Sequence, residues 1–131
     1  MTQSSRRPSE RGSAVVDFVL VMVILIPLFL GIMQVALVLY VRNTLTAAAS
    51  EGARYGATIN HVPANGAART RDQIAGTLTG KYAANVSPGI DEIEGAQVVV
   101  ITVDADVPAL GLFGPSVHLT VKGHAIKEAT D

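Results

Sequence analysis

The longest apolar run of the chain lies near its beginning and predicts one membrane-spanning helix. Residues 18–41 read FVLVMVILIPLFLGIMQVALVLYV and hold no charged side chain. As a helix that rises about 1.5 Å per residue, this run spans roughly 36 Å, more than the roughly 30 Å of a bilayer's hydrocarbon core. Gln34 is the strongly polar side chain in its middle. Its amide either bonds to its own helix or contacts a neighbouring helix, and the sequence leaves both interpretations open.

The same helix is expected to continue beyond the membrane. Residues 43–57 read NTLTAAASEGARYGA, a stretch rich in alanine, and no proline follows until Pro63. Ala48, Gly52 and Gly56 form a row of small side chains at a spacing of four. Such a row either reflects tolerance of glycine near a fraying helix end or forms a face on which another helix packs closely. The packing face is the favoured interpretation.

A loop, a shorter helix and a turn-rich segment follow. Residues 60–68 predict a loop because asparagine, proline and glycine cluster there. Residues 69–82 predict a second, weaker helix, since its apolar side chains recur at a spacing of four. Residues 85–95 are rich in turn-forming residues and predict a turn region rather than a strand.

Two later segments alternate between apolar and polar side chains and predict β-strands. In residues 97–107 the odd positions from 99 onward are apolar, and Thr and Asp occupy even positions. In residues 117–126 the first three odd positions are apolar, while His, Thr and Lys alternate with them. One apolar face on each strand suits a small antiparallel sheet laid against a helix.

The alternation also predicts how the two strands pair. If they pair about Leu112, Asp106 lies opposite His118 and Thr102 lies opposite Lys122. That register places polar side chains opposite polar ones, so one face of the sheet is apolar and the other is polar.

Together these patterns predict an α+β fold in three parts. A long N-terminal transmembrane helix extends outward and is followed by a small helix and an antiparallel β-hairpin ectodomain. Residues 1–12 are expected to form a basic cytoplasmic leader, residues 13–58 the transmembrane helix with its extension, and residues 59–131 a small extracytoplasmic α+β domain.

Charge predicts the orientation of the span. Arg6, Arg7 and Arg11 precede it and only Arg42 follows it closely. The positive-inside rule therefore places the N-terminus in the cytoplasm and the C-terminal domain outside the cell membrane. A secretory signal peptide is the alternative, because residues 47–49 offer an Ala-x-Ala-like cleavage site. The apolar run is longer than the roughly 7–15 residues typical of a signal peptide.

Composition excludes several kinds of function. The chain has no cysteine, which removes disulfides, thiolate metal sites and cysteine nucleophiles. Residues 43–131 carry six Lys and Arg against nine Asp and Glu, a net charge of −3. An acidic domain in a chain with 5% aromatic residues argues against nucleic-acid binding, which needs a basic face.

No constellation of residues points to catalysis. His118 and His124 are separated by about 20 Å along a strand, too far to share a metal ion. Asp104, Asp106 and His118 would gather on one sheet face, where acidic side chains usually interact only with solvent. We therefore expect no enzymatic activity, no cofactor, no metal and no small-molecule substrate.

The residues around the span resemble a known family. Gly12, followed by an apolar helix with an acidic residue at its fifth position and then an aromatic one, resembles the cleavage signal of type IV pilins and pseudopilins. Within that group the chain resembles the TadE-like proteins of Tad/Flp pilus assembly systems. The resemblance covers about residues 11–57 and is carried by Arg11-Gly12, Val16-Asp17-Phe18, Pro27, Gly31, Tyr40-Val41-Arg42-Asn43 and Glu51-Gly52-Ala53-Arg54-Tyr55-Gly56.

The resemblance implies processing at the N-terminus. A prepilin peptidase would cut after Gly12 and leave Ser13 as the new N-terminal residue. Asp17 would then lie about 6 Å along the helix from the new amine. The carboxylate would either pair with that amine or a neighbour's, or extend alone to the membrane interface. The chain departs from the family at this position, where glutamate is usual.

The resemblance also implies a structural role. The chain would be a minor pilin-like, or pseudopilin, component of a Tad/Flp-type pilus assembly or secretion system, held in the cell membrane by one helix. Gly31 and Gln34, with the small-residue row, would pack against partner helices. Partners would be pilin-like subunits, Tad platform and assembly proteins, and the prepilin peptidase. The alternative is a membrane-anchored or secreted small binding module unrelated to pili.

Overall fold

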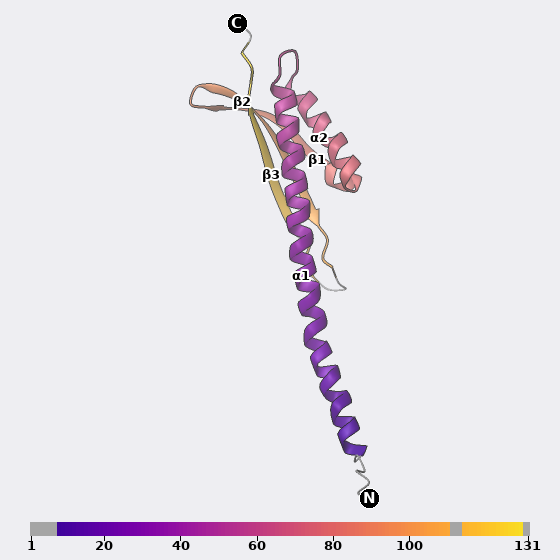
Figure 1. Cartoon of the computed structure of the whole chain (residues 1–131). Helices are drawn as coiled ribbons and strands as arrows, with labels where there is room; N and C mark the ends of the chain where they lie inside the picture. Colours follow the sequence, from indigo (N-terminus) through magenta and orange to yellow (C-terminus); the bar gives the residue numbers. More distant parts are fainter. Residues whose placement is uncertain (1–7, 111–113, 130–131) are drawn as a thin grey trace, which may run out of the picture.

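A computed structural model describes residues 8–110 and 114–129, which form a long helix with a small α+β unit on its C-terminal half (Figure 1). We call residues 8–40 the shaft, and residues 41–110 with 114–129 the head. The elements follow in the order α1 (Pro8–Ala57), α2 (Pro63–Thr77), the 3₁₀ turn η1 (Gly80–Ala83), β1 (Asn85–Ile93), β2 (Ala96–Val107) and β3 (Val117–Ile126).

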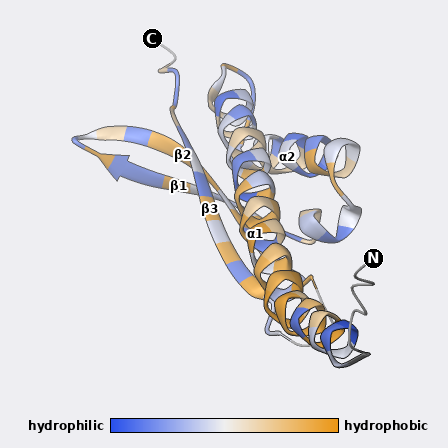
Figure 2. Cartoon of the chain, turned by 60° about the horizontal axis from the view of Figure 1, so that its bottom comes forward, coloured by the Kyte–Doolittle hydropathy of each residue, from blue (hydrophilic) through white to orange (hydrophobic). Residues whose placement is uncertain are grey.

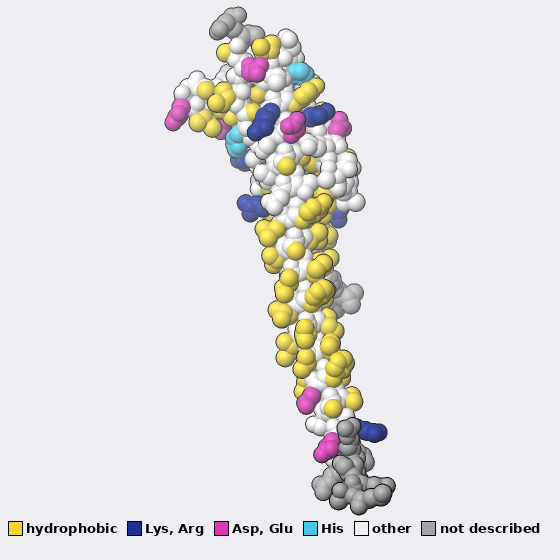
Figure 3. All heavy atoms as spheres, viewed as in Figure 1, with side chains coloured by type: hydrophobic (Ala, Val, Ile, Leu, Met, Phe, Trp, Pro, Cys, Tyr) yellow, Lys and Arg dark blue, Asp and Glu magenta, His cyan; other side chains and the backbone are white. Residues whose placement is uncertain are grey.

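The shaft is apolar around its whole circumference. Nearly every side chain from Val15 to Met33 is exposed, and the helix continues through Pro27 without interruption. Figure 3 shows hydrophobic side chains covering the shaft, while charged ones gather on the head and at the N-terminal end. A helix that is hydrophobic all round belongs in an apolar environment. α1 is long and apolar enough to cross a membrane.

The head consists of two layers. β1, β2 and β3 form an antiparallel sheet in that order, and α1 and α2 cover one face of it (Figures 1 and 2). The core contains Leu45 from α1 and Ile74 from α2, both fully buried. From β2 it contains the predicted odd positions, all buried: Val99, Ile101, Val103, Ala105 and Val107. The opposite, or polar, face of the sheet carries Thr, Asp, His and Lys side chains over most of β2 and β3, with apolar Val98 and Ile126 at the end near the β1–β2 turn. The α+β fold class is thus confirmed.

The predicted pairing of β2 and β3 is also confirmed. Asp106 pairs with His118 and Thr102 with Lys122 in an antiparallel ladder that joins Val98–Val107 to Val117–Ile126. The residue about which the pairing was predicted to centre, Leu112, lies outside the described residues. Register follows from the alternation, because a slip by one residue would turn the buried face of β3 toward water.

Two segments differ from the prediction. Residues 60–68 are not a loop throughout, because α2 begins at Pro63, and it ends at Thr77 rather than near Tyr82. Proline suits the first turn of a helix, where its missing N–H is not needed. Asn65 assists by accepting a hydrogen bond from the backbone N–H of Val62 through its side-chain oxygen, at 2.9 Å.

The turn-rich segment forms the edge strand β1. Glu94 and Gly95 both have positive φ, 52° and 82°, and Ile93 pairs with Ala96 across them. Two central residues with positive φ make a type I′ turn, the connection that best joins two twisted antiparallel strands. Pro88 is tolerated because an edge strand leaves one side unpaired. The turn was visible in the sequence, but the strand before it lacks alternation.

Candidate functional site

The residues of the expected cleavage signal lie at the exposed N-terminal end of the shaft. Gly12, Ser13, Asp17 and Phe18 are all helical and exposed. A Cβ atom at Gly12 would meet no atom within 4 Å, so the fold of the described chain does not require glycine there. Among the described residues no hydrogen bond or ion pair engages the Asp17 carboxylate. The structure therefore places this carboxylate on an open apolar surface.

One face of the shaft carries a shallow apolar groove around Gly31. The side chains that line it follow two rows at a spacing of four, so they lie on one side of the helix. Gly31 lies at its centre, and a Cβ atom there would meet nothing within 4 Å. No described part of the chain covers the groove, which is lined by Pro27, Leu28, Gly31, Ile32, Val35, Ala36 and Leu39.

Gln34 bonds to the head rather than to its own helix. Its Nε2 donates to the carbonyl of Pro108 at 3.3 Å, and its Oε1 accepts from the backbone N–H of Leu110 at 2.6 Å. The amide thus satisfies one acceptor and one donor of the backbone that follows β2. Neither of the two partners considered from the sequence, its own helix or a neighbour's, is the one that the structure shows.

The small-residue row lies against α2 of the same chain. Ala48, Gly52 and Gly56 are buried. A Cβ atom on Gly52 would overlap Thr70 and lie 2.6 Å from the carbonyl oxygen of Gly66. The buried Thr70 hydroxyl donates to the carbonyl of Gly66 at 2.9 Å and lies 3.3 Å from that of Ala48. The two helices therefore meet almost backbone to backbone.

The polar face of the sheet gathers one histidine and two aspartates. His118 Nδ1 lies 2.8 Å from the Asp106 carboxylate, and Thr120 donates to Asp104 at 2.6 Å. The hydrogen bond to Asp106, with the negative charges of Asp106 and Asp104, raises the pKa of His118 above its ordinary value of 6.5. Within the described residues no three His, Asp or Glu side chains are arranged to hold a metal ion.

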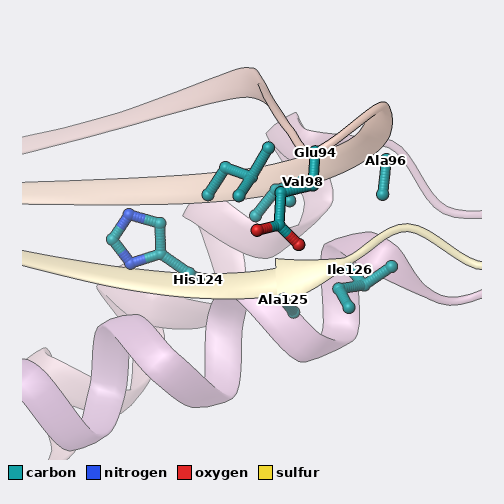
Figure 4. Close-up of a pocket in the computed structure, with 7 residues that line it drawn as sticks. Glu94, Ala96, Val98, His124, Ala125 and Ile126 are labelled. Atoms are coloured by element: carbon teal, nitrogen blue, oxygen red, sulfur yellow. The ribbon is translucent and has the colours of Figure 1, made fainter.

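A shallow, mainly apolar pocket lies at the far end of the sheet. Its polar side chains are Glu94 and His124; Figure 4 shows them on the β1–β2 turn and on β3. No hydrogen bond joins them. The remaining lining is Ile93, Ala96, Val98, Ala125 and Ile126. An open apolar pocket of this kind can contact a protein surface, but it does not position an acid, a base and a nucleophile together.

Comparison with known proteins finds a match for about a third of the chain. Residues 12–54 match the sequence model of the TadE-like proteins. This segment is a TadE-like region. The TadE-like family is a structural family associated with Tad pili. No curated protein and no solved structure matches the chain.

The TadE-like region coincides with one structural unit, α1. It begins at Gly12, includes the whole apolar part of the shaft, and ends at Arg54 inside the head. The part of the region in the head supplies the buried helix side of the core, including Val41, Leu45 and Ala53. The family pattern thus combines a membrane-anchor-like helix with the surface on which the head folds.

Sequence reasoning missed the attachment of residues 108–110 to the shaft. Gln34 and Leu110 are 76 residues apart, and no spacing rule connects them. A weak signal existed, since one polar side chain interrupts an otherwise apolar run. Such a residue needs a partner. The partner is an irregular backbone segment, which periodicity cannot locate.

Proposed function

We propose that this chain is a minor pilin-like structural component of a Tad/Flp-type pilus assembly or secretion system, with α1 inserted in the cell membrane. The proposal combines the TadE-like region with the uncovered apolar groove on the shaft. The observation that carries it is that the two halves of α1 differ in burial. The C-terminal half packs into the core of the head, and the N-terminal half contacts little of the described chain. A free, all-round apolar shaft is available for lipid and for the helices of pilin-like subunits.

The polar Asp17 side chain supports a pilin-like role for the shaft. An isolated carboxylate within an apolar helix is costly in a membrane, and pairing with an amine removes much of that cost. After cleavage behind Gly12, the amine of Ser13 would lie about 6 Å from Asp17 along the helix. The amine of a neighbouring subunit is an equivalent partner. The positive end of the helix dipole adds a further favourable term.

Intact-mass measurement of the protein purified from its native membranes tests the processing step. We expect a mass that corresponds to a chain beginning at Ser13. A chain that retains Met1 at steady state would contradict cleavage.

Orientation follows from charge in this proposal. The arginines before the span hold the N-terminus in the cytoplasm, where a prepilin peptidase acts, and the head lies outside. The orientation can be measured in intact cells with a single cysteine introduced at Ile126, which is 71% exposed, because the chain has no native cysteine. Labelling by a membrane-impermeant maleimide is expected; labelling only after lysis contradicts the orientation.

Deletion of the gene with imaging of surface fibres tests the assembly role. We expect fibres to be lost or strongly reduced and to return when the full chain is supplied. Complementation by Asp17→Glu should succeed because the carboxylate is kept, whereas Asp17→Asn, of equal size but neutral, should fail. Normal piliation in the deletion strain would overturn the proposal.

A further inference from the structure

The attachment of the head to Gln34 constrains where a membrane surface can lie. Residues 108–110 leave β2 and run beside the shaft, with Pro108 and Leu110 hydrogen-bonded to Gln34. In Figure 1 the coloured start of the segment after β2 extends below the sheet, and we call residues 108–110 the connection. The sequence analysis placed the apolar span up to Val41, seven residues beyond this contact. A span of that extent would immerse the connection in hydrocarbon.

Irregular backbone such as that of residues 108–110 is unstable inside the hydrocarbon core. A lipid-facing segment with N–H and C=O groups outside helices or closed sheets leaves them without partners, at a cost of several kcal/mol each. Gln34 satisfies one carbonyl and one N–H of this segment, and Ala109 lies between them without a described partner. The connection can therefore lie at the hydrocarbon boundary, where water and headgroups are available, but not within the core.

The length of the shaft fits this boundary. Twenty residues of helix cover about 30 Å, the thickness of the hydrocarbon core, so a span that ends at Gln34 begins near Ala14. The side chains from Val15 to Met33 are the nearly continuously exposed apolar ones. Tyr40 lies about 9 Å beyond Gln34 along the helix, at the outer side of the headgroup layer, where its half-apolar ring is favoured.

We propose that residues 108–110 rest on the lipid surface on the head's side of the membrane, with the backbone of Pro108 and Leu110 held to α1 by Gln34 at the edge of the hydrocarbon. The partner is the headgroup and glycerol layer of the bilayer. Leu110, 39% exposed beside the apolar shaft, is the side chain that enters this layer. This inference rests on the membrane insertion of α1 in the proposed function, and it adds a second contact with lipid.

The boundary has a consequence for Asp17. With hydrocarbon beginning near Ala14, the Cα atom of Asp17 lies about 4.5 Å inside the core rather than at its edge. A partner for the carboxylate is correspondingly more necessary. The position of the head on the membrane surface thus sets the depth of Asp17, on which the proposed pilin-like role depends.

Single-cysteine labelling of the full chain in lipid vesicles tests the boundary, because the protein contains no cysteine of its own. Spin labels at Val23 and Phe29, both exposed on the shaft, report depth by their relative accessibility to oxygen and to a water-soluble nickel chelate. A span centred on residues 14–33 places Val23 at the bilayer centre and Phe29 about 9 Å above it. A span over residues 18–41 would make Phe29 the deeper position instead.

An environment-sensitive fluorophore at Leu110→Cys tests the surface contact, with Ile126→Cys as the matched exposed position at the far end of the sheet. We expect the label at 110 to shift its emission to shorter wavelength in phosphatidylcholine–phosphatidylglycerol vesicles and to lose intensity with lipids quenched near the headgroup. The label at 126 should do neither. Adding Gln34→Leu should reduce both effects at 110, whereas Gln73→Leu, an exposed change on α2, should not.

The outcomes separate this inference from membrane anchoring itself. If labels on the shaft are deep but Leu110→Cys behaves as Ile126→Cys does, or if Phe29 is deeper than Val23, the surface contact is wrong and anchoring stands. If no shaft label is shielded from the nickel chelate, both fail. A label at 110 that shifts emission without lipid quenching indicates contact with protein and also overturns the lipid proposal.

Discussion

Replacing Gly66 with alanine should destabilise the head, although the same change elsewhere on α2 should not. Gly66 faces the small-residue row of α1. A Cβ atom there would overlap the carbonyl oxygen of Gly52 and lie 3.2 Å from the Cα atom of Gly56. Gly76 is on the same helix, and a Cβ atom there would meet nothing within 4 Å. The two positions therefore form a matched pair that differs in packing.

Helix propensity and packing together decide whether each variant gains or loses stability. Alanine is favoured over glycine inside a helix by about 1 kcal/mol, so Gly76→Ala should be neutral or stabilise the head by up to this amount. At Gly66 the same gain opposes an overlap with backbone, which cannot rotate away as a side chain can. Overpacking a tight contact costs about 1–3 kcal/mol, and backbone against backbone belongs at the upper end. We expect Gly66→Ala to lose about 2 kcal/mol, a difference of about 3 kcal/mol between the variants.

Thermal unfolding of the full chain in detergent micelles measures the difference. Tyrosine emission reports the head through buried Tyr82, since the chain has no tryptophan. For a domain of this size, 1 kcal/mol corresponds to about 4–8 °C in Tm, so the two variants should differ by about 12 °C or more. Hydrogen exchange of the α2 amides should quicken in Gly66→Ala alone. A Tm for Gly66→Ala equal to or above that of Gly76→Ala would refute close helix contact as the reason for glycine.

Three further predictions concern the head. Asp106→Asn should lower the pKa of His118 measured by NMR, and an unchanged pKa would contradict the assignment. Because the pKa is raised in the folded state, any stabilisation from this pair is complete below about pH 6.5 and is lost as pH rises through the folded pKa. Thr70→Val keeps the shape of a fully buried side chain but removes its hydroxyl, and urea unfolding should show a loss of about 1 kcal/mol rather than none. Arg71 donates to the carbonyl of Val86 at 2.7 Å, so Arg71→Met should speed hydrogen exchange in β1 while leaving β3 unchanged; equal protection in β1 would show that the contact does not hold the edge strand.

The family pattern within the head has a physical explanation in this structure. Of the Glu51–Tyr55 segment, Gly52 faces α2 and Ala53 is fully buried. The ring centres of Tyr55 and His61 are 4.3 Å apart, and the guanidinium of Arg69 lies 5.7 Å from the ring centre of Tyr55. The end of α1 is closed by the C-terminal segment, where the backbone N–H of Glu128 donates to the carbonyl of Ala57 at 3.0 Å. The segment therefore positions the elements around the helix end.

Close packing between α1 and the sheet follows the same rule. A Cβ atom on Gly123 of β3 would overlap the backbone of Ala49. Alanine and glycine thus occupy both sides of α1, one row toward α2 and one toward the sheet. A single helix can lie between two close neighbours only if its side chains are small on both sides.

The pattern of apolar residues predicted the elements in which that pattern is regular. The shaft was predicted because a long apolar run without charge indicates a spanning helix. The β2–β3 pair was predicted because one buried face imposes a period of two, and even the opposition of Asp106 and His118 followed. β1 was missed because only Val86 among its nine residues is buried, so no alternation is imposed on it. The start of α2 was missed because glycine, alanine and proline there serve close packing rather than an apolar stripe.

The candidate site was predictable in part for a similar reason. Asp17 stands out in the sequence as an acidic residue within an apolar run, and its role stays a prediction. The contact of Gln34 with residues 108–110 depends on where an irregular segment ends in space, which no local pattern encodes. The depth of insertion that we propose likewise depends on the whole fold, because it rests on the contact between residues 108–110 and Gln34.

Photo-crosslinking in intact cells tests most directly the claim that the free shaft packs against pilin-like subunits. A photoreactive amino acid at Ile32, which is 61% exposed in the groove, is compared with one at Ile126 on the head. We predict covalent products between position 32 and pilin-like subunits, identified by mass spectrometry, and none from position 126. Products from position 32 that contain no pilin-like subunit, in cells that bear fibres, would contradict the central claim.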